Sequence, residues 1–313
     1  MKPKYSVIVP CYNEEEVITE TYKRLNTVME SLEETYEIIF INDGSKDNTA
    51  FIIAGFCETN KSVKLLNFSR NFGHMPALTA GLDYASGEAV FVIDADLQDP
   101  PEVFLEMITK WKEGYHVVYG KRNKRKGESV FKKLSAMAFY RFLQSMTNVD
   151  LPVDTGEFRL MDRKVVEVVK TLPEKNRYLR GLVSWVGFKQ TAVMYDRSER
   201  FAGETKYPLR KMIKFAMDAI TSFSYKPLKL ATLIGFLMSI ASFVYLIVIF
   251  IQHFFTDTHV AGWTSLIGVM LLTQGIVLII LGLMGEYVGR LYEEAKGRPL
   301  YIVQEVIGGE ADN

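Results

Sequence analysis

The chain has 313 residues, enough for a domain of about 200 residues and a further structural unit. Its 37 basic residues equal its 37 acidic residues, so the net charge is zero. This balance argues against a general nucleic-acid-binding protein, which would carry a basic excess.

The N-terminal part of the chain alternates between short apolar runs and helical patterns. The runs predict buried strands at 5–10, 36–41, 63–68, 89–93 and 116–120, with further extended segments at 154–161 and 189–195. A helix is expected after each of the first four strands, and Asn13 is expected to cap the first helix. Because strands that alternate with helices form parallel sheets, we predict an α/β fold with a doubly wound parallel sheet.

A polar stretch follows the fourth apolar run. Residues 91–99 are Phe-Val-Ile-Asp-Ala-Asp-Leu-Gln-Asp, and extended backbone would place Asp94, Asp96 and Gln98 on one side. Their oxygens are hard ligands that suit Mg²⁺ or Mn²⁺, with a phosphate completing the coordination shell. Asp-x-Asp alone is a weak motif, so solvated carboxylates at a strand end are the alternative.

Polar residues also follow other predicted strands. Asp43 follows the second strand, Arg70 the third and Arg122 the fifth. Parallel sheets bind ligands beyond the carboxyl ends of their strands, so these residues and the acidic pair are expected to form one site. The sequence has no Gly-x-Gly-x-x-Gly after the first strand, which weakens a dinucleotide-binding interpretation.

Two segments combine an apolar stripe with basic residues. They cover about 129–147 and 208–226, and both are expected to be amphipathic helices in the membrane interface. A core-facing helix is the alternative for the first. Between them, 197–207 carries Arg200 and Lys206 near Gly203 and predicts a mobile cationic loop over a diphosphate. A basic hinge before the membrane is the alternative for this loop.

Two long stretches near the C-terminus lack charge. No Asp, Glu, Lys or Arg lies between Lys229 and Asp257 or between Asp257 and Glu286. Each stretch exceeds the roughly 20 apolar residues that cross a bilayer, so two transmembrane helices are predicted at about 228–251 and 264–285. The connecting loop has no Lys or Arg while both flanks do, which predicts cytoplasmic ends. A buried hairpin of a soluble protein is the alternative.

Several motifs together resemble a known family. They are Ser6-Val-Ile-Val-Pro-Cys-Tyr-Asn-Glu-Glu, Asn42-Asp-Gly-Ser, Asp94-Ala-Asp-Leu-Gln and the two spans. They are similar to polyprenyl-phosphate glycosyltransferases, inverting enzymes of the GT-A fold that are related to dolichol-phosphate mannose synthase. The tail, with Gly285-Glu-Tyr-Val-Gly-Arg-Leu-Tyr-Glu-Glu and Gly297-Arg-Pro-Leu-Tyr, resembles the bactoprenol glucosyltransferase subgroup.

The resemblance implies an activity and an organisation. It implies metal-dependent transfer of a hexose, glucose being the first expectation, from a UDP-sugar to undecaprenyl phosphate in the lipid bilayer, with Mg²⁺ or Mn²⁺ as cofactor. A Rossmann-like GT-A catalytic domain would span 1–207, an interface helix 208–226, the spans 227–287 and a cytoplasmic tail 288–313. The catalytic domain and both termini would be cytoplasmic at the plasma membrane, and the resemblance is compatible with a homo-oligomer.

The resemblance also assigns roles to residues of the nucleotide and metal sites. Asp43 would bond the uracil, Asp94 would contact the donor sugar or ribose, and Arg122 would meet phosphate. The metal would be held by Asp96 and Gln98. The remaining residues would line the nucleotide pocket or contact the diphosphate or acceptor phosphate: Pro10, Tyr12, Glu14, Arg200 and Lys206.

The resemblance implies three catalytic residues, Asp94, Asp96 and Asp154. Of these, Asp154 matches the acidic residue proposed as the base in that subgroup. A phosphate monoester has a second pKa of about 6, so the attacking oxygen hardly needs a base near neutral pH. Asp154 could instead position sugar hydroxyls or an arginine such as Arg159.

Two rival functions share parts of this pattern. A processive polysaccharide synthase is expected to carry Gln-x-x-Arg-Trp, which the sequence lacks, and more spans. A membrane-tethered nucleotide-sugar sensor without catalysis would be expected to lack the metal ligands, yet Asp94, Asp96 and Gln98 are present.

Overall fold

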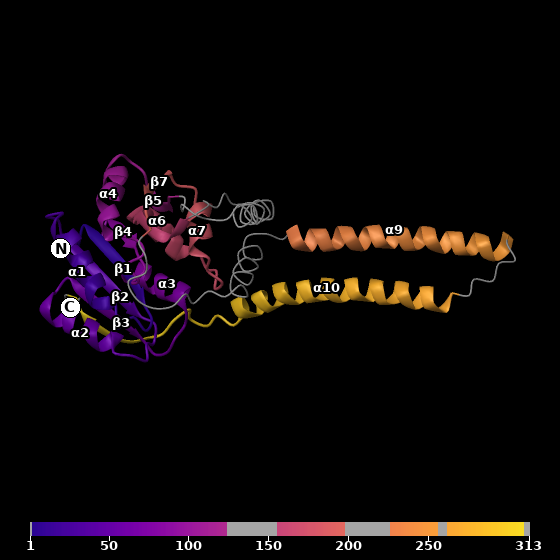
Figure 1. The fold of residues 1–313 in the computed structure, drawn as a ribbon, viewed down its shortest axis with the longest axis horizontal. Coiled ribbons are helices and arrows are strands. Elements are labelled where there is room, and N and C mark those ends of the chain that lie inside the picture. Colours follow the sequence, from indigo (N-terminus) through magenta and orange to yellow (C-terminus); the bar gives the residue numbers. More distant parts are fainter. Residues whose placement is uncertain (1, 124–154, 198–225, 256–261, 310–313) are drawn as a thin grey trace.

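The structure is a computed structural model that describes residues 2–123, 155–197, 226–255 and 262–309. A globular body carries a long helical hairpin (Figure 1). Asp154, Arg200, Lys206, the segment predicted at 129–147 and all of the segment predicted at 208–226 except Lys226 lie outside the described residues.

One mixed sheet forms the centre of the body. Its order is β7-β5-β6-β4-β1-β2-β3-β8. Six strands run in one direction: β1 (Tyr5–Cys11), β2 (Tyr36–Asn42), β3 (Val63–Phe68), β4 (Ala89–Val92), β5 (Val117–Arg122) and β7 (Gln190–Tyr195). The predicted α/β fold is therefore confirmed, but the purely parallel sheet is wrong. Strand β6 (Thr155–Asp162) runs antiparallel between β4 and β5, and β8 (Val303–Gly308) runs antiparallel along β3.

Helices cover both faces of the sheet. One face packs against α1 (Ile18–Glu30), α2 (Thr49–Thr59) and α4 (Phe104–Lys112), the last preceded by the short 3-10 helix η1 (Pro101–Val103). The other face packs against α3 (His74–Tyr84), α6 (Arg163–Thr171) and α7 (Leu179–Trp185). Side chains alternate between the two cores along each strand, so Val7 and Val9 face the first core while Ile8 faces the second.

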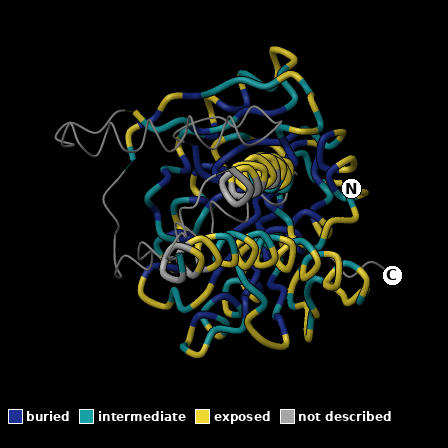
Figure 2. The backbone as a smooth tube through the Cα atoms, turned by 90° about the vertical axis from the view of Figure 1, so that its right-hand side faces the viewer, coloured by how far each residue is buried: buried dark blue, intermediate teal, exposed yellow. Residues whose placement is uncertain are grey.

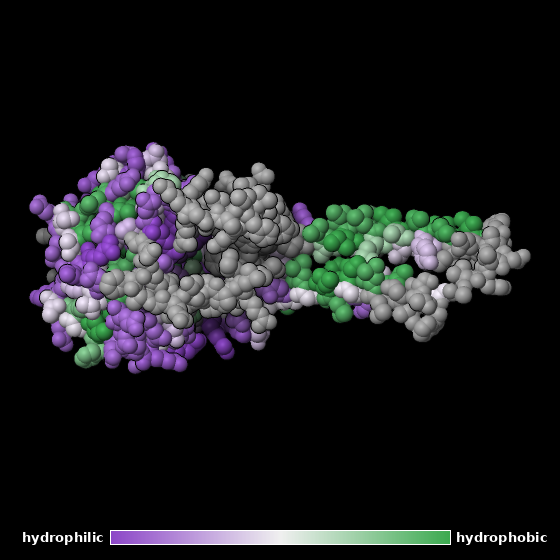
Figure 3. All heavy atoms as spheres, viewed as in Figure 1, coloured by the Kyte–Doolittle hydropathy of each residue, from purple (hydrophilic) through white to green (hydrophobic). Residues whose placement is uncertain are grey.

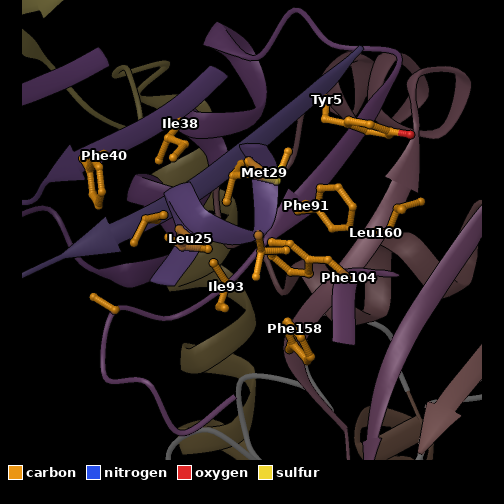
Figure 4. Close-up of a cluster of buried hydrophobic side chains, with 14 of the residues drawn as sticks. Tyr5, Leu25, Met29, Ile38, Phe40, Phe91, Ile93, Phe104, Phe158 and Leu160 are labelled. Carbon is orange, nitrogen blue, oxygen red and sulfur yellow. The ribbon is translucent and has the colours of Figure 1, made fainter. Parts of the chain in front are cut away.

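Aromatic stacking and close approach fix both cores. In the first core, Phe91 of β4 stacks on Phe104 of α4 with ring centroids 4.0 Å apart, and Phe158 of β6 continues the stack (Figure 4). In the second core, Gly81 lets α3 lie directly on β1, because a Cβ there would come within 2.2 Å of Ile8 Cγ2. These contacts pack α4 against β4 and α3 against β1, the two neighbouring strands at the centre of the sheet.

The helix after β1 starts later than predicted. Helix α1 begins at Ile18, and Asn13 has a positive φ of 55°, so the predicted N-cap is wrong. Asn13 instead joins two loops, because its Oδ1 accepts from the backbone N–H of Lys46 and its own N–H donates to Ser45 Oγ. Asn tolerates the left-handed conformation that this bridge requires.

The C-terminal segment is part of the sheet and not only a tail. Tyr301 stacks on Phe68 at the end of β3, with centroids 5.2 Å apart, and its hydroxyl donates to Asp83 Oδ2 over 2.7 Å. The backbone N–H of Ser69 donates to the carbonyl of Ile302. Strand β8 then continues along β3. The segment after the hairpin therefore returns to the sheet that is formed by the residues before the hairpin.

The hairpin consists of α9 (Lys226–Phe255) and α10 (Trp263–Ala295), which extend side by side from the body (Figure 1). Both are long and apolar enough to cross a membrane, over Leu228–Tyr245 and Leu272–Ala295. Their large side chains face outward: Phe236 is 63% and Ile279 is 73% exposed. Figure 2 shows exposed residues along the hairpin and buried strands in the body. Figure 3 shows that the surface of the hairpin is largely hydrophobic. This exposure disfavours a hairpin buried in the body.

A buried polar network ties the sheet together at the edge opposite the carboxyl ends of its parallel strands. Glu37 on β2 is 4% exposed and accepts hydrogen bonds from Ser6 Oγ (2.6 Å), the backbone N–H of Ser86 (2.7 Å) and Lys64 Nζ (2.9 Å). Burial raises the pKa of Glu37, but these hydrogen bonds outweigh burial, so the net pKa lies below its usual value.

Glu37→Gln is expected to lower the free energy of unfolding by about 1–3 kcal/mol at neutral pH, because Lys64 loses its charged partner. A lowered pKa stabilises the fold above the unfolded pKa of about 4.3, and this contribution is lost as pH falls through the folded pKa. Thermal melting of the detergent-purified protein should show a clear difference between wild type and variant at pH 7 and a smaller one near pH 3.5. Equal differences at both pH values would contradict the role of the Glu37 charge.

Candidate active site

The acidic stretch after β4 turns instead of continuing as a strand. Strand β4 ends at Val92, Leu97 has a positive φ of 56°, and the Gln98 N–H donates to Asp96 Oδ1 over 3.1 Å. The predicted alternation along extended backbone is therefore wrong. Asp96 and Gln98 are nevertheless brought onto one turn, at the carboxyl end of a central strand.

Asp94 lies at the base of this turn against the start of α3. Its Oδ1 lies 3.6 Å from Nε2 of His74, and this oxygen has no hydrogen-bond partner within the described ranges. Burial raises the pKa of Asp94, the nearby carboxylates of Asp99, Asp96 and Glu157 raise it further, and His74 opposes them. His74 was not predicted from the sequence, because a single histidine at the start of a helix gives no distinctive signal.

The Asp99 carboxylate brings together Tyr195, Arg122 and Arg197. Sequence reasoning predicted Arg122 but missed Asp99 and Tyr195. This carboxylate is 1% exposed and accepts from the Tyr195 hydroxyl over 2.5 Å. Its Oδ1 lies 3.8 Å from Arg122 Nη2 and 3.7 Å from Arg197 Nε, and Arg122 Nε donates to the Tyr195 hydroxyl oxygen. Asp99 thus holds two guanidinium groups near the acidic turn, one at the end of β5 and one after β7.

Asp43 joins the end of β2 to the loop before α3. Its two carboxylate oxygens accept from the backbone N–H groups of Phe72 (2.6 Å) and Gly73 (2.9 Å), and burial raises its pKa. Gly44 has a φ of +65°, and a Cβ there would lie 2.5 Å from the backbone of Arg70. The predicted bond from Asp43 to uracil would therefore have to use the remaining lone pairs of this carboxylate.

The other predicted nucleotide residues lie at the carboxyl end of β1. Pro10 is buried within β1, Tyr12 is 36% exposed just after the strand, and the Glu14 N–H donates to Thr49 Oγ1. The structure brings these three residues, Asp43, the Asp94–Asp99 turn and Arg122 to one edge of the sheet, as the sequence predicted.

The antiparallel strand β6 adds a buried ionic group to this edge. Arg159 donates from Nη2 to Glu157 Oε2 over 3.1 Å and to the carbonyl of Gly156. Arg180 of α7 lies 3.7 Å from Glu157 Oε1. Within the described ranges the partner of Arg159 is therefore Glu157, which was not among the predicted residues.

The donor groups at the turn fit a hard divalent cation. Asp96 and Gln98 supply carboxylate and amide oxygens, and Asp94 keeps a buried oxygen without a hydrogen bond. Across the described ranges, no three His, Cys, Asp or Glu side chains form a ready metal cluster, so a ligand phosphate would have to complete the shell. The adjacent arginines suit anionic phosphate groups.

The hairpin joins the body at this same edge. Glu294 near the end of α10 accepts from the backbone N–H of Lys175 over 2.6 Å, in the loop that leads into α7 and Arg180. The following segment reaches the sheet at Phe68, the carboxyl end of β3. The candidate site therefore faces the side from which the two apolar helices emerge.

Comparisons with known proteins agree with this architecture. Residues 6–169 match the family described as glycosyl transferase family 2, and residues 226–291 match a GtrB C-terminal hairpin. The chain is 61% identical to "Uncharacterized glycosyltransferase YkcC" of Bacillus subtilis, over 98% of this chain and 95% of that protein. It is 43% identical to "Bactoprenol glucosyl transferase" of Shigella phage SfII, over 96% of this chain and 98% of that protein.

A solved structure was also matched. It is glucosyl-3-phosphoglycerate synthase from Mycobacterium tuberculosis, in complex with Mn²⁺, UDP-glucose and phosphoglyceric acid, with 20% identity, a TM-score of 0.45, and coverage of 70% of this chain and 78% of that one. The family model matches the sheet domain, and the two relatives match nearly the whole chain. The chain belongs to glycosyl transferase family 2 and is a transferase enzyme with a GT-A fold.

Proposed function

We propose that the enzyme transfers a hexose, with glucose as the first candidate, from a UDP-sugar to the phosphate of a membrane polyprenyl phosphate such as undecaprenyl phosphate. The observation that carries this proposal is the placement of the Asp94–Asp99 turn and its two arginines at the edge where the apolar hairpin begins. A soluble acceptor would not require that placement. The phage relative named for bactoprenol matches both the sheet domain and the hairpin region, which supports a lipid acceptor.

The reaction is a substitution at the anomeric carbon. An oxygen of the acceptor phosphate forms a bond to this carbon while the bond to the UDP oxygen breaks, so UDP leaves and the configuration inverts. Arg122 and Arg197 would bind phosphate oxygens and offset their negative charge. Asp96 and Gln98 would hold Mg²⁺ or Mn²⁺, which supplies Lewis-acid stabilisation of the leaving diphosphate.

The proposed orientation follows from the sheet. Because β8 pairs with β3, the end of α10 lies beside the sheet domain, and the start of α9 lies at the same end of the hairpin (Figure 1). This arrangement supports placing both termini on one side of the membrane. The Lys and Arg residues at the flanks favour the cytoplasmic side of the membrane. The roles of Asp154, Arg200 and Lys206, the domain boundaries and a homo-oligomer stay predictions.

The test is a transfer assay with full-length protein in detergent, undecaprenyl phosphate, Mg²⁺ or Mn²⁺ and a panel of UDP-hexoses. We expect one UDP-hexose to yield a lipid product that carries a single sugar. We expect this product to be absent when EDTA removes the metal. Polymer formation would support a processive synthase, and UDP-sugar binding without turnover would support a sensor. Either of these results would reject the proposed function.

A further inference from the structure

A second carboxylate, Glu157, lies beside Asp94 on the face of the sheet that α3 and α7 cover. Val92 of β4 pairs with Arg159 of β6 in antiparallel register. Because β4 ends at Val92, the residues that precede Arg159 on β6 extend past this strand toward the turn that holds Asp94. A Cβ on Gly156 would lie 3.0 Å from Arg122 Nη2, and the Glu157 carboxylate raises the pKa of Asp94, so Glu157 lies close to the candidate site. Glu157 is 7% exposed and so lies beneath the candidate site and not on the outer surface.

Glu157 has one satisfied oxygen and one unsatisfied oxygen. Oε2 accepts from Arg159, whereas Oε1 lies 3.7 Å from Arg180 Nη2, beyond hydrogen-bond distance, and has no hydrogen-bond partner in the described part of the chain. The Arg180 Nε is buried and equally without a hydrogen-bond partner there. A buried charged atom without a hydrogen bond is costly, so a ligand that supplies both a donor and an acceptor would remove two such costs at once.

The charges around these two atoms restrict the ligand. Asp94 and Glu157 are acidic, while Arg159 and Arg180 are basic, so the four charges balance when His74 is neutral. A phosphate at Glu157 Oε1 would be repelled by two carboxylates, and an apolar group would leave both atoms unsatisfied. A neutral molecule with several hydroxyl groups offers donors to Oε1 and acceptors to Nε.

We infer that Glu157 and Arg180 form a subsite for the hydroxyl groups of the donor sugar and set which hexose the enzyme uses. The inference rests on the proposed function, because it names the sugar-binding part of that site. Arg159 is a positioning residue in this arrangement, since its Nη2 donates to Oε2 and leaves Oε1 to the ligand. A site built to pair a particular hydroxyl discriminates strongly against sugars that lack it or hold it in another orientation.

The test compares kinetics for UDP-glucose and its C4 epimer UDP-galactose, together with calorimetric binding of UDP and of each UDP-hexose. For Glu157→Gln we expect a KM for the preferred UDP-hexose raised by about 10–100-fold, because a hydrogen bond to a charged group is lost. The preference between the two epimers should fall at least about tenfold, while the Kd of UDP should change less than about twofold. Arg180→Lys, which keeps the charge but loses Nε, should reduce the preference in the same way.

Glu37→Gln is the matched control, because it also neutralises a buried strand glutamate paired with a cation, at the opposite edge of the sheet. It should leave the epimer preference unchanged. If both subsite variants retain the wild-type preference, or weaken UDP and UDP-hexose binding equally, the subsite is rejected and the group is only structural. Wild-type protein that transfers no hexose would reject the proposed function instead, and the UDP-hexose binding data would still decide the subsite.

Discussion

Asp96→Ala is expected to slow hexose transfer by roughly 10²–10³-fold or more, because the substitution removes a carboxylate that would hold the metal on the leaving diphosphate. The effect should persist in excess Mg²⁺ or Mn²⁺, since Gln98 alone offers a weak neutral ligand. Initial rates with saturating UDP-hexose and undecaprenyl phosphate measure it.

Asp162→Ala provides a matched control for this loss. Asp162 ends β6 at the opposite edge of the sheet, where its side chain caps α6 through the Lys164 N–H and accepts from Trp111 Nε1. Its replacement should lower stability by about 1 kcal/mol through the lost cap and leave turnover near wild type. Near-normal transfer by Asp96→Ala with excess metal would contradict the metal assignment.

Asp99→Ala is expected to have the second-largest effect, acting through the arginines. Without this buried carboxylate, Arg122 and Arg197 lose the anion that holds them near the turn, and removal of one partner from a buried ionic group costs about 3–5 kcal/mol. We expect the KM for UDP-hexose to rise at least about tenfold, because misplaced guanidinium groups bind phosphate poorly.

A milder variant separates positioning from stability. Tyr195→Phe removes only the hydroxyl that donates to Asp99 and accepts from Arg122, so the KM should rise several-fold while the melting temperature changes little. Melting curves and the separate effects on KM and kcat are the measurements. A large loss of melting temperature with an unchanged KM in both variants would show that Asp99 serves the fold alone.

Local pattern was sufficient to predict most of the sheet. The strand at 63–68 has the predicted bounds, and the other predicted strands differ by one or two residues, because turn residues border each apolar run. The direction of β6 was not predictable, since strand orientation depends on partners far away in sequence. Strand β8 was missed because Val-Gln-Glu-Val-Ile-Gly is short and partly polar, and its stability comes from pairing with β3.

The sequence predicted those site residues that directly follow a strand and missed the others. Asp94, Asp96 and Arg122 were found because each comes at or just after the end of an apolar run, whose carboxyl end marks the binding edge. Asp99 and Tyr195 lie 96 positions apart, and Glu157 lies on the strand that runs antiparallel beside β4, so no spacing in the sequence reveals that these residues belong to the site. Asn13 was misassigned because its capping preference and its loop-bridging preference look identical in sequence.

The most direct test is an experimental structure of the full chain with UDP and Mn²⁺, with the ion located by its anomalous scattering. We expect the ion to lie about 2.1 Å from an Asp96 oxygen, a usual distance for a small divalent cation, with the diphosphate between it and Arg122. An ion bound away from residues 94–99, or a diphosphate at an edge of the sheet remote from the hairpin, would contradict the proposed site.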